Sequence, residues 1–228
     1  MVIGFSTGSL ALGDFRRGVS LVEGRTLQAI ELSALREDEV ASLVSGLGSL
    51  ELSGYHYISV HAPSRLRQMS EHELIETLEP VFQRGWNVII HPDVIAEPAL
   101  WLQFGSLICI ENMDKRKLCG RTADELEECF LALPEASLCF DVAHARQIDP
   151  TMYEARAILS RHGQRLAQIH LSSLATSSKH EPLGYPMQLA YGRIADLIDK
   201  SIPIILETPV DDDQIDDQLR WATLIADQ

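Results

Sequence analysis

SLCFDVAHA, residues 137–145, joins a short apolar run to a carboxylate and an imidazole. Residues 138–140 are apolar, Asp141 ends the run and His144 follows three residues later. A continuous apolar run of this length is typical of a strand that is buried on both faces, as in a parallel sheet. The two polar residues are either a turn with a surface histidine or two ligands of a metal ion.

Seven further apolar runs of the same kind recur along the chain. They are VIGFS (2–6), LQAIELS (27–33), YISVHAP (57–63), NVIIHPD (87–93), LICIENM (107–113), LAQIHLS (166–172) and IPIILETP (202–209). Amphipathic helical patterns lie between most of them, at 37–48, 70–85, 122–133, 151–163, 187–200 and 216–227. Eight buried strands alternating with helices predict an α/β protein with a single-domain (β/α)8 TIM barrel over residues 1–228. A doubly wound open sheet is the alternative.

Two of the predicted helices begin with a capping signal. Ser70 is followed by Glu73, and Thr122 is followed by Glu125. A hydroxyl residue with a glutamate three residues later predicts a reciprocal capping box at the helix start.

The composition is that of an ordinary globular protein, with 228 residues of which 46% are hydrophobic and 23% charged. No apolar stretch approaches the about 20 residues of a membrane span, and the N-terminal residues lack a signal-peptide pattern. We therefore expect a cytoplasmic protein with no membrane contact. The four cysteines form no CxxC pair and are expected to be reduced. A net charge of −14 argues against non-specific binding of nucleic acid, and the sequence favours no particular oligomeric state.

Ionisable side chains lie at the ends of seven of the eight predicted strands. They are Glu31, His61, His91, Glu111, Asp141 with His144, His170, and Glu207. Only the first strand, which ends FSTGS (5–9), lacks such a residue. Because the carboxyl ends of the strands of a parallel barrel meet at one face, these side chains should converge.

A ring of carboxylates in a dry barrel mouth is costly unless positive charge offsets it. Imidazole and carboxylate groups are ligands that zinc, manganese and related divalent ions accept. The sequence therefore predicts a metal site with Asp141 as a ligand and His144 as a second ligand or a substrate contact. For His180, in the loop after the seventh strand, a solvent-exposed role and a functional role stay open. His56, His72 and His162 are interpreted as structural or surface residues.

Basic residues gather in the segments that follow five of the predicted strands. They are Arg16, Arg17, Arg65, Arg67, Lys115, Arg116, Lys117, Arg146 and Lys179. In a chain that is acidic overall, a basic rim at the active face indicates an anionic substrate, such as a phosphate or a carboxylate. Scattered solubilising charge is the alternative explanation.

The strand ends together resemble those of the xylose isomerase-like barrels. The matching segments are SVHAP, IIHPD, ICIEN, FDVAH, IHLS and ILETP, in this order along the chain. That family includes sugar and sugar-phosphate isomerases and epimerases, hydroxypyruvate isomerase, and the endonuclease IV branch of apurinic endonucleases. The segment HLSSLATSSKHEP (170–182) resembles a loop of hydroxypyruvate isomerase, but LGYP follows it where that enzyme has a glycine-rich acidic turn.

The resemblance implies a set of metal ligands. In the isomerases and epimerases one divalent ion is held by residues that correspond to Glu111, Asp141, His170 and Glu207. Endonuclease IV adds histidines for a zinc cluster, and the matching positions are His61, His91, His144 and His180. Ser178 stands where endonuclease IV has a further aspartate ligand. The chain therefore lacks one of the ligands that the resemblance implies for a third zinc ion.

Three functions are compatible with these residues. The first is a metal-dependent isomerase or epimerase of a small sugar, sugar phosphate or hydroxy-keto acid, which acts through an enediolate. In it Glu111 and Glu207 would transfer the proton. The substrate would be bound by Glu31, His61, His91, His144 and His180, with Lys179 or Lys115 at its anionic end. Zinc or manganese is the expected ion, with magnesium or cobalt as alternatives. The second function is an endonuclease IV-type phosphodiesterase with two or three zinc ions, and the third is a non-catalytic barrel that binds a metal or a ligand.

Overall fold

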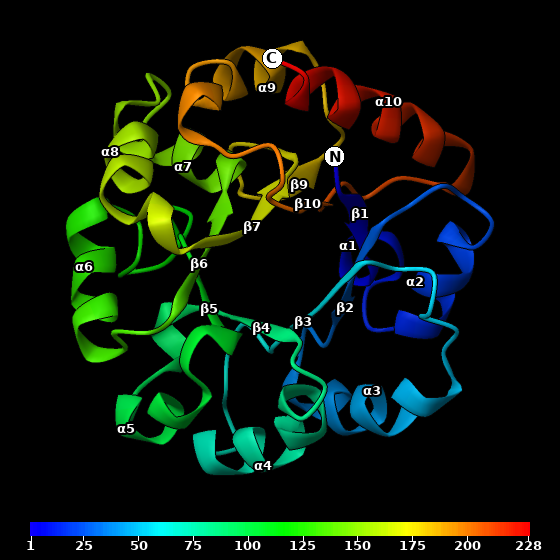
Figure 1. Cartoon of the computed structure of the whole chain (residues 1–228), viewed down its shortest axis with the longest axis vertical. Helices are drawn as coiled ribbons and strands as arrows, with labels where there is room; N and C mark the ends of the chain where they lie inside the picture. The colour runs from blue at the N-terminus through cyan, green and yellow to red at the C-terminus, as the bar shows by residue number, and fades with distance from the viewer.

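Eight parallel strands close into a barrel in the computed structural model, which describes residues 1–228 (Figure 1). The strands are β1 (Ile3–Ser6), β2 (Ala29–Ser33), β3 (Tyr57–His61), β4 (Asn87–Ile90), β5 (Ile108–Glu111), β6 (Ser137–Asp141), β7 (Leu166–Leu171) and β10 (Ile204–Leu206). Their order around the barrel is β1-β10-β7-β6-β5-β4-β3-β2, and β2 pairs again with β1. The predicted (β/α)8 fold is therefore confirmed. The open sheet is excluded, because β1 is paired on both sides.

Most of the helices form a ring outside the barrel (Figure 1). They are α1 (Thr7–Ala11), α2 (Phe15–Val22), α3 (Val40–Gly46), α4 (Glu71–Phe82), α5 (Pro98–Trp101), α6 (Ala123–Ala132), α7 (Val142–Ile148), α8 (Tyr153–His162), α9 (Tyr185–Tyr191) and α10 (Ile215–Ala226). None of them has the length and apolar character needed to span a membrane. A two-stranded antiparallel hairpin, β8 (Ser173–Leu174) and β9 (His180–Glu181), follows β7 and was not predicted.

The apolar runs are buried on both faces, as the sequence indicates. Outward-facing strand residues join the helices in one large hydrophobic cluster, whereas Ile89, Cys109 and Cys139 form a small separate cluster. All four cysteines are free, as expected, and two of them are buried. Side chains alternate along a strand, so Glu111 and Asp141, two residues after Cys109 and Cys139, face the same side as these cysteines. The register thus places the carboxylates above this apolar cluster.

One of the two predicted capping boxes forms completely. Ser70 Oγ accepts a hydrogen bond from the Glu73 N–H (3.2 Å), and a Glu73 carboxylate oxygen accepts one from the Ser70 N–H (2.8 Å). Thr122 likewise accepts from the Glu125 N–H, but the Glu125 carboxylate binds the backbone and guanidinium of Arg121 instead of Thr122. The prediction of a second full box is therefore wrong, because a charged donor adjacent to the helix start competes for the glutamate.

Candidate metal centre

The predicted strand-end side chains converge at the carboxyl ends of the barrel strands. A cavity of about 470 Å³ opens there. Its lining includes His61, His91, Glu111, His144, His180 and Glu207. Asp141 and His170 are fully buried and lie in contact with these residues. The structure therefore brings together all eight residues that were predicted as metal ligands.

Glu111 lies at the middle of this assembly. Its Oε2 is 3.3 Å from His61 Nε2 and 3.1 Å from His91 Nε2. Its Oε1 is 3.0 Å from His170 Nδ1 and 3.5 Å from His144 Nδ1. The two oxygens of one carboxylate thus face two different sets of imidazoles.

The possible ligands form three groups, within each of which the donor atoms lie within 4.8 Å of one another. The deep group is Glu111, Asp141, His170 and Glu207; the histidine group is His61, His91 and Glu111; the loop group is Asp141, His144 and His180. Glu111 belongs to the first two groups and Asp141 to the first and third. The three groups are therefore contiguous rather than separate sites.

Three histidines each donate one ring N–H to a fixed acceptor. His61 Nδ1–H donates to the Ala62 carbonyl (2.7 Å), and His144 Nδ1–H donates to the Asn112 carbonyl (2.9 Å). His170 Nε2–H donates to Glu31 (2.9 Å). In each case the bond fixes one ring nitrogen as the donor and leaves the other unprotonated in the neutral ring. Such second-layer bonds are typical of metal-binding histidines.

Asp141 also has the environment of a metal ligand. Its Oδ1 accepts the His144 N–H (2.7 Å), and its backbone is fixed by two hydrogen bonds with the Asn112 side chain. Its Oδ2 is buried and has no hydrogen-bond partner. An unpaired buried carboxylate oxygen is costly unless a cation meets it. The donor set therefore fits a divalent ion, which Glu111, Asp141, His170 and Glu207 would hold in the deep group.

The pKa shifts of the metal-free centre also indicate that its carboxylates require positive charge. Burial alone would raise the pKa of Glu111, but His170, with His61 and His91, holds it well below its usual range. Burial alone would lower the pKa of His61, but the hydrogen bond with Glu111 and the nearby Glu31 and Glu207 raise it to about 9. Protons on the imidazoles thus supply the positive charge that the carboxylates require, and a divalent ion would replace them.

Two residues that were predicted to bind substrate lie elsewhere. Glu31 is fully buried and does not line the cavity; it accepts hydrogen bonds from His170 and Gln168 and therefore orients a candidate ligand. Lys115 donates to the Thr176 carbonyl (2.6 Å) and does not line the cavity. The structure therefore gives no support to a substrate contact at either residue. Glu31 lies below the mouth of the barrel, and Lys115 is held by a loop carbonyl.

The predicted basic rim is present only in part. Of the nine basic residues, Arg116, Lys117 and Lys179 line the cavity. Arg16 and Arg17 lie on α2. Of the histidines expected to be structural or at the surface, His56 and His72 are exposed, and His162 is buried and bonded to the Ala123 carbonyl.

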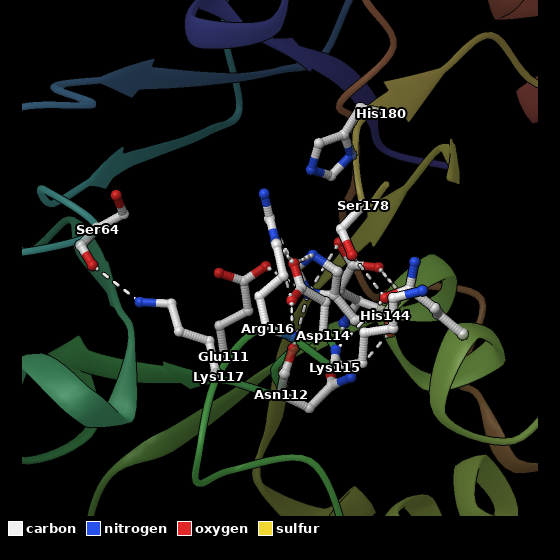
Figure 2. A network of polar contacts seen from close by, with 12 residues as sticks. Ser64, Glu111, Asn112, Asp114, Lys115, Arg116, Lys117, His144, Ser178 and His180 are labelled. Atoms are coloured by element: carbon white, nitrogen blue, oxygen red, sulfur yellow. Dashed lines mark hydrogen bonds and ion pairs between the residues drawn. The ribbon is translucent and has the colours of Figure 1, made fainter. Parts of the chain in front are cut away.

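The loop after β5 contains Asp114, which the sequence did not single out, and gives Lys117 a structural role. Asp114 is buried and binds the Nε of Arg116 through both carboxylate oxygens (3.1 and 2.9 Å). Lys117 Nζ donates to the Ser64 carbonyl (Figure 2). It also donates to Asp93, so it connects three loops. The only sequence signal for these roles was the cluster of polar residues directly after Glu111.

Ser178 occupies the position where the resemblance to endonuclease IV leads one to expect an aspartate. It is buried, and its Oγ donates to Gln147 Oε1 (2.7 Å). The hydroxyl is therefore engaged by the protein, and the loop group depends on Asp141 for its only carboxylate. His180 is fixed nearby by a hydrogen bond of 2.7 Å between its Nδ1 and Ser172 Oγ.

Solved structures of other proteins share this architecture. Endonuclease IV from Thermus thermophilus is 20% identical, with a TM-score of 0.62 and all of both chains covered. A proposed sugar phosphate isomerase/epimerase from Anabaena variabilis is 12% identical, with a TM-score of 0.55 over 96% of this chain and 87% of that one. An uncharacterised protein from Parabacteroides distasonis is 13% identical, with a TM-score of 0.59 over 97% of both chains.

These similarities confirm the predicted (β/α)8 barrel fold. No protein-family model matches the chain, and no curated protein sequence matches it. The activity must therefore be argued from the residues of the centre.

Proposed function

We propose that the chain is a metal-dependent hydrolase that cleaves small phosphate esters with two or more divalent ions at this centre. The observation that carries the proposal is the position of Glu111, with Oε2 facing His61 and His91 and Oε1 facing His170. A carboxylate placed between two sets of nitrogen ligands is suited to bridge two ions, as in two-metal phosphatases and nucleases. Zinc or manganese suits such a mixed set of imidazoles and carboxylates.

In this reaction different side chains of the protein would transfer the proton and bind the phosphate. Divalent ions held there would supply Lewis-acid chemistry. In the reaction, the oxygen of a water molecule bonds to phosphorus, the bond from phosphorus to the ester oxygen breaks, and the departing alcohol gains a proton. Glu207 lines the cavity 3.4 Å from His170, so it is placed to hold the proton that the water loses. Arg116 and Lys179 line the same cavity and would bind phosphate oxygens.

The charge of the whole molecule and the size of its cavity support a small substrate rather than a nucleic acid. The net charge of −14 opposes the approach of a polyanion. The cavity of about 470 Å³ is of the size that binds a small molecule. In this respect the proposal departs from the endonuclease from Thermus, which has the same fold.

A metal-dependent isomerase or epimerase is the second candidate, and one observation favours it. Because Ser178 is not an acid, the only carboxylate of the loop group is that of Asp141, which also belongs to the deep group. This weakens the case for a full metal cluster. With a single ion in the deep group, Glu111 and Glu207, which lie 3.0 and 3.4 Å from His170 Nδ1, would be a pair for proton transfer.

Metal content separates the two candidates. The protein is purified without a chelator, and the ions per chain are measured by elemental analysis for wild type, His91→Gln and the control His72→Gln, whose side chain is exposed. The hydrolase proposal predicts at least two ions in wild type and in the control, and about one fewer in His91→Gln. It also predicts release of phosphate from small esters. One ion per chain in all three proteins, with no phosphate released, would refute it in favour of the isomerase.

A further inference from the structure

The mouth of the cavity is divided into two unlike arcs. The loops after β10, β1 and β2 contribute Pro209, Leu12 and Leu35, which we call the apolar arc. Apart from Glu207, the other lining residues on this side are Ser6, Gly8 and Ser9. These three strands are neighbours in the barrel, and β1 is the strand that ends without an ionisable side chain. The gap in the ring of ionisable residues thus carries three apolar side chains beside the small residues Ser6, Gly8 and Ser9.

Three basic residues line the other part of the mouth, beside Met113 and Asp114. Arg116 and Lys117 follow β5, and Lys179 lies in the hairpin after β7. Because β5 is four places from β1 in either direction around the closed barrel (Figure 1), the loop that carries Arg116 and Lys117 lies opposite the loop that carries Leu12. Lys179 follows β7, two places from β1. Asp114 binds Nε and Nη2 of Arg116, whereas Arg116 Nη1 has no acceptor in the protein. Arg116 is therefore held in place with one amino group available to an anion.

Leu12 is the residue of the apolar arc that is hardest to explain by folding alone. Its side chain is 71% exposed, so it gains little from burial. Its backbone has φ 54° and ψ −130°, a conformation that suits glycine and is unfavourable for a branched side chain. An exposed leucine in a strained backbone at the mouth of a cavity indicates a role in binding rather than in stability.

We propose that the apolar arc binds the organic group of the substrate while Arg116 and Lys179 bind its phosphate. The preferred substrates are accordingly phosphate esters of apolar alcohols, aromatic or aliphatic, rather than esters of sugars. This inference rests on the proposed hydrolase function. Leu12 is the residue that sets the specificity, since its loop lies opposite the loop that carries Arg116 and its side chain is exposed at the mouth.

The experiment compares two esters in three proteins loaded with metal. Values of kcat/KM for phenyl phosphate and glycerol phosphate are measured in wild type, Leu12→Gly and the control Leu118→Gly. Leu118 is a suitable control because it is 90% exposed in the loop after β5 and does not line the cavity. Wild type should prefer phenyl phosphate. Leu12→Gly should lower kcat/KM for phenyl phosphate about tenfold, the loss expected for one leucine contact, and leave glycerol phosphate nearly unchanged.

Stability provides a second readout, because glycine relieves the backbone of residue 12. The thermal midpoint of Leu12→Gly should equal or exceed that of wild type, which separates loss of a contact from loss of fold. An equal loss for both esters, or no loss for either, would overturn the assignment of Leu12.

A binding measurement keeps the inference testable if no ester is cleaved, a result that would refute the hydrolase proposal instead. Calorimetry on the metal-loaded protein compares phenylphosphonate with methylphosphonate. We expect phenylphosphonate to bind more tightly in wild type and in Leu118→Gly, and the difference to disappear in Leu12→Gly. Equal affinity of wild type for the two phosphonates would overturn the apolar arc as a binding wall.

Discussion

Replacing His61 with glutamine should flatten the pH dependence of the stability of the metal-free protein. The carboxylates around His61 raise its pKa from 6.5 to about 9 in the folded chain. Each unit by which the pKa differs between the folded and unfolded states corresponds to about 1.4 kcal/mol. A pKa difference of about 2.5 therefore gives on the order of 3 kcal/mol of stability. His61 is buried, so solvent screening reduces this figure little.

The sign follows from the raised pKa. Stability from the charged imidazole is fully present below pH 6.5, where His61 is protonated in both states, and is lost as the pH rises through 9. Urea unfolding with a chelator present, at intervals from pH 6 to 9.5, measures the free energy of unfolding of wild type, His61→Gln and the exposed control His72→Gln. Wild type and the control should lose about 3 kcal/mol more than His61→Gln over this range. Parallel curves for all three proteins would refute the reasoning.

Two further predictions concern the fold. Glu71→Ala should lower the free energy of unfolding by about 3 kcal/mol, because the Glu71 carboxylate accepts the indole N–H of the buried Trp101 (2.7 Å) and two backbone N–H groups. The control is Glu76→Ala on the same helix, and equal urea midpoints for the two variants would contradict the prediction. Gly4→Ala should lower the free energy of unfolding by at least about 3 kcal/mol, because the new Cβ would lie 1.9 Å from the Ala29 carbonyl oxygen. A thermal midpoint near that of wild type would contradict this, since it would show that β1 and β2 can separate without loss of stability.

Much of the barrel could be predicted because its strands carry a strong local signal. Each apolar run contains enough Val, Ile and Leu to require burial on both faces, and the predicted and observed strands overlap in all eight cases. The β8–β9 hairpin was missed because each of its strands has only two residues within a polar loop, so no periodicity can develop. Glu125 was assigned to a capping box because its sequence position did not show that Arg121 would bind it more strongly.

The candidate centre was predictable to the extent that strand ends determine it. A residue at the end of a parallel barrel strand must lie near the axis, and for this reason His61, Glu111 and Asp141 came together as expected. Depth and direction within the mouth depend on tertiary contacts instead. Glu31 follows the same pattern in sequence, yet its register places it low in the barrel, beside His170.

No candidate metal ligand comes from β1 or β2, so this barrel can separate reaction from recognition. Lower in the barrel, β1 and β2 lie so close that a Cβ at Gly4 would meet the Ala29 carbonyl oxygen. The candidate ligands come from the ends of β3 to β7 and β10 or from the segments that follow these strands, and they depend on one another for charge. The loops after β1 and β2 carry no ligand, so residues such as Leu12 can change without disturbing the centre. A barrel built in this way can keep its metal ligands while it changes its substrate.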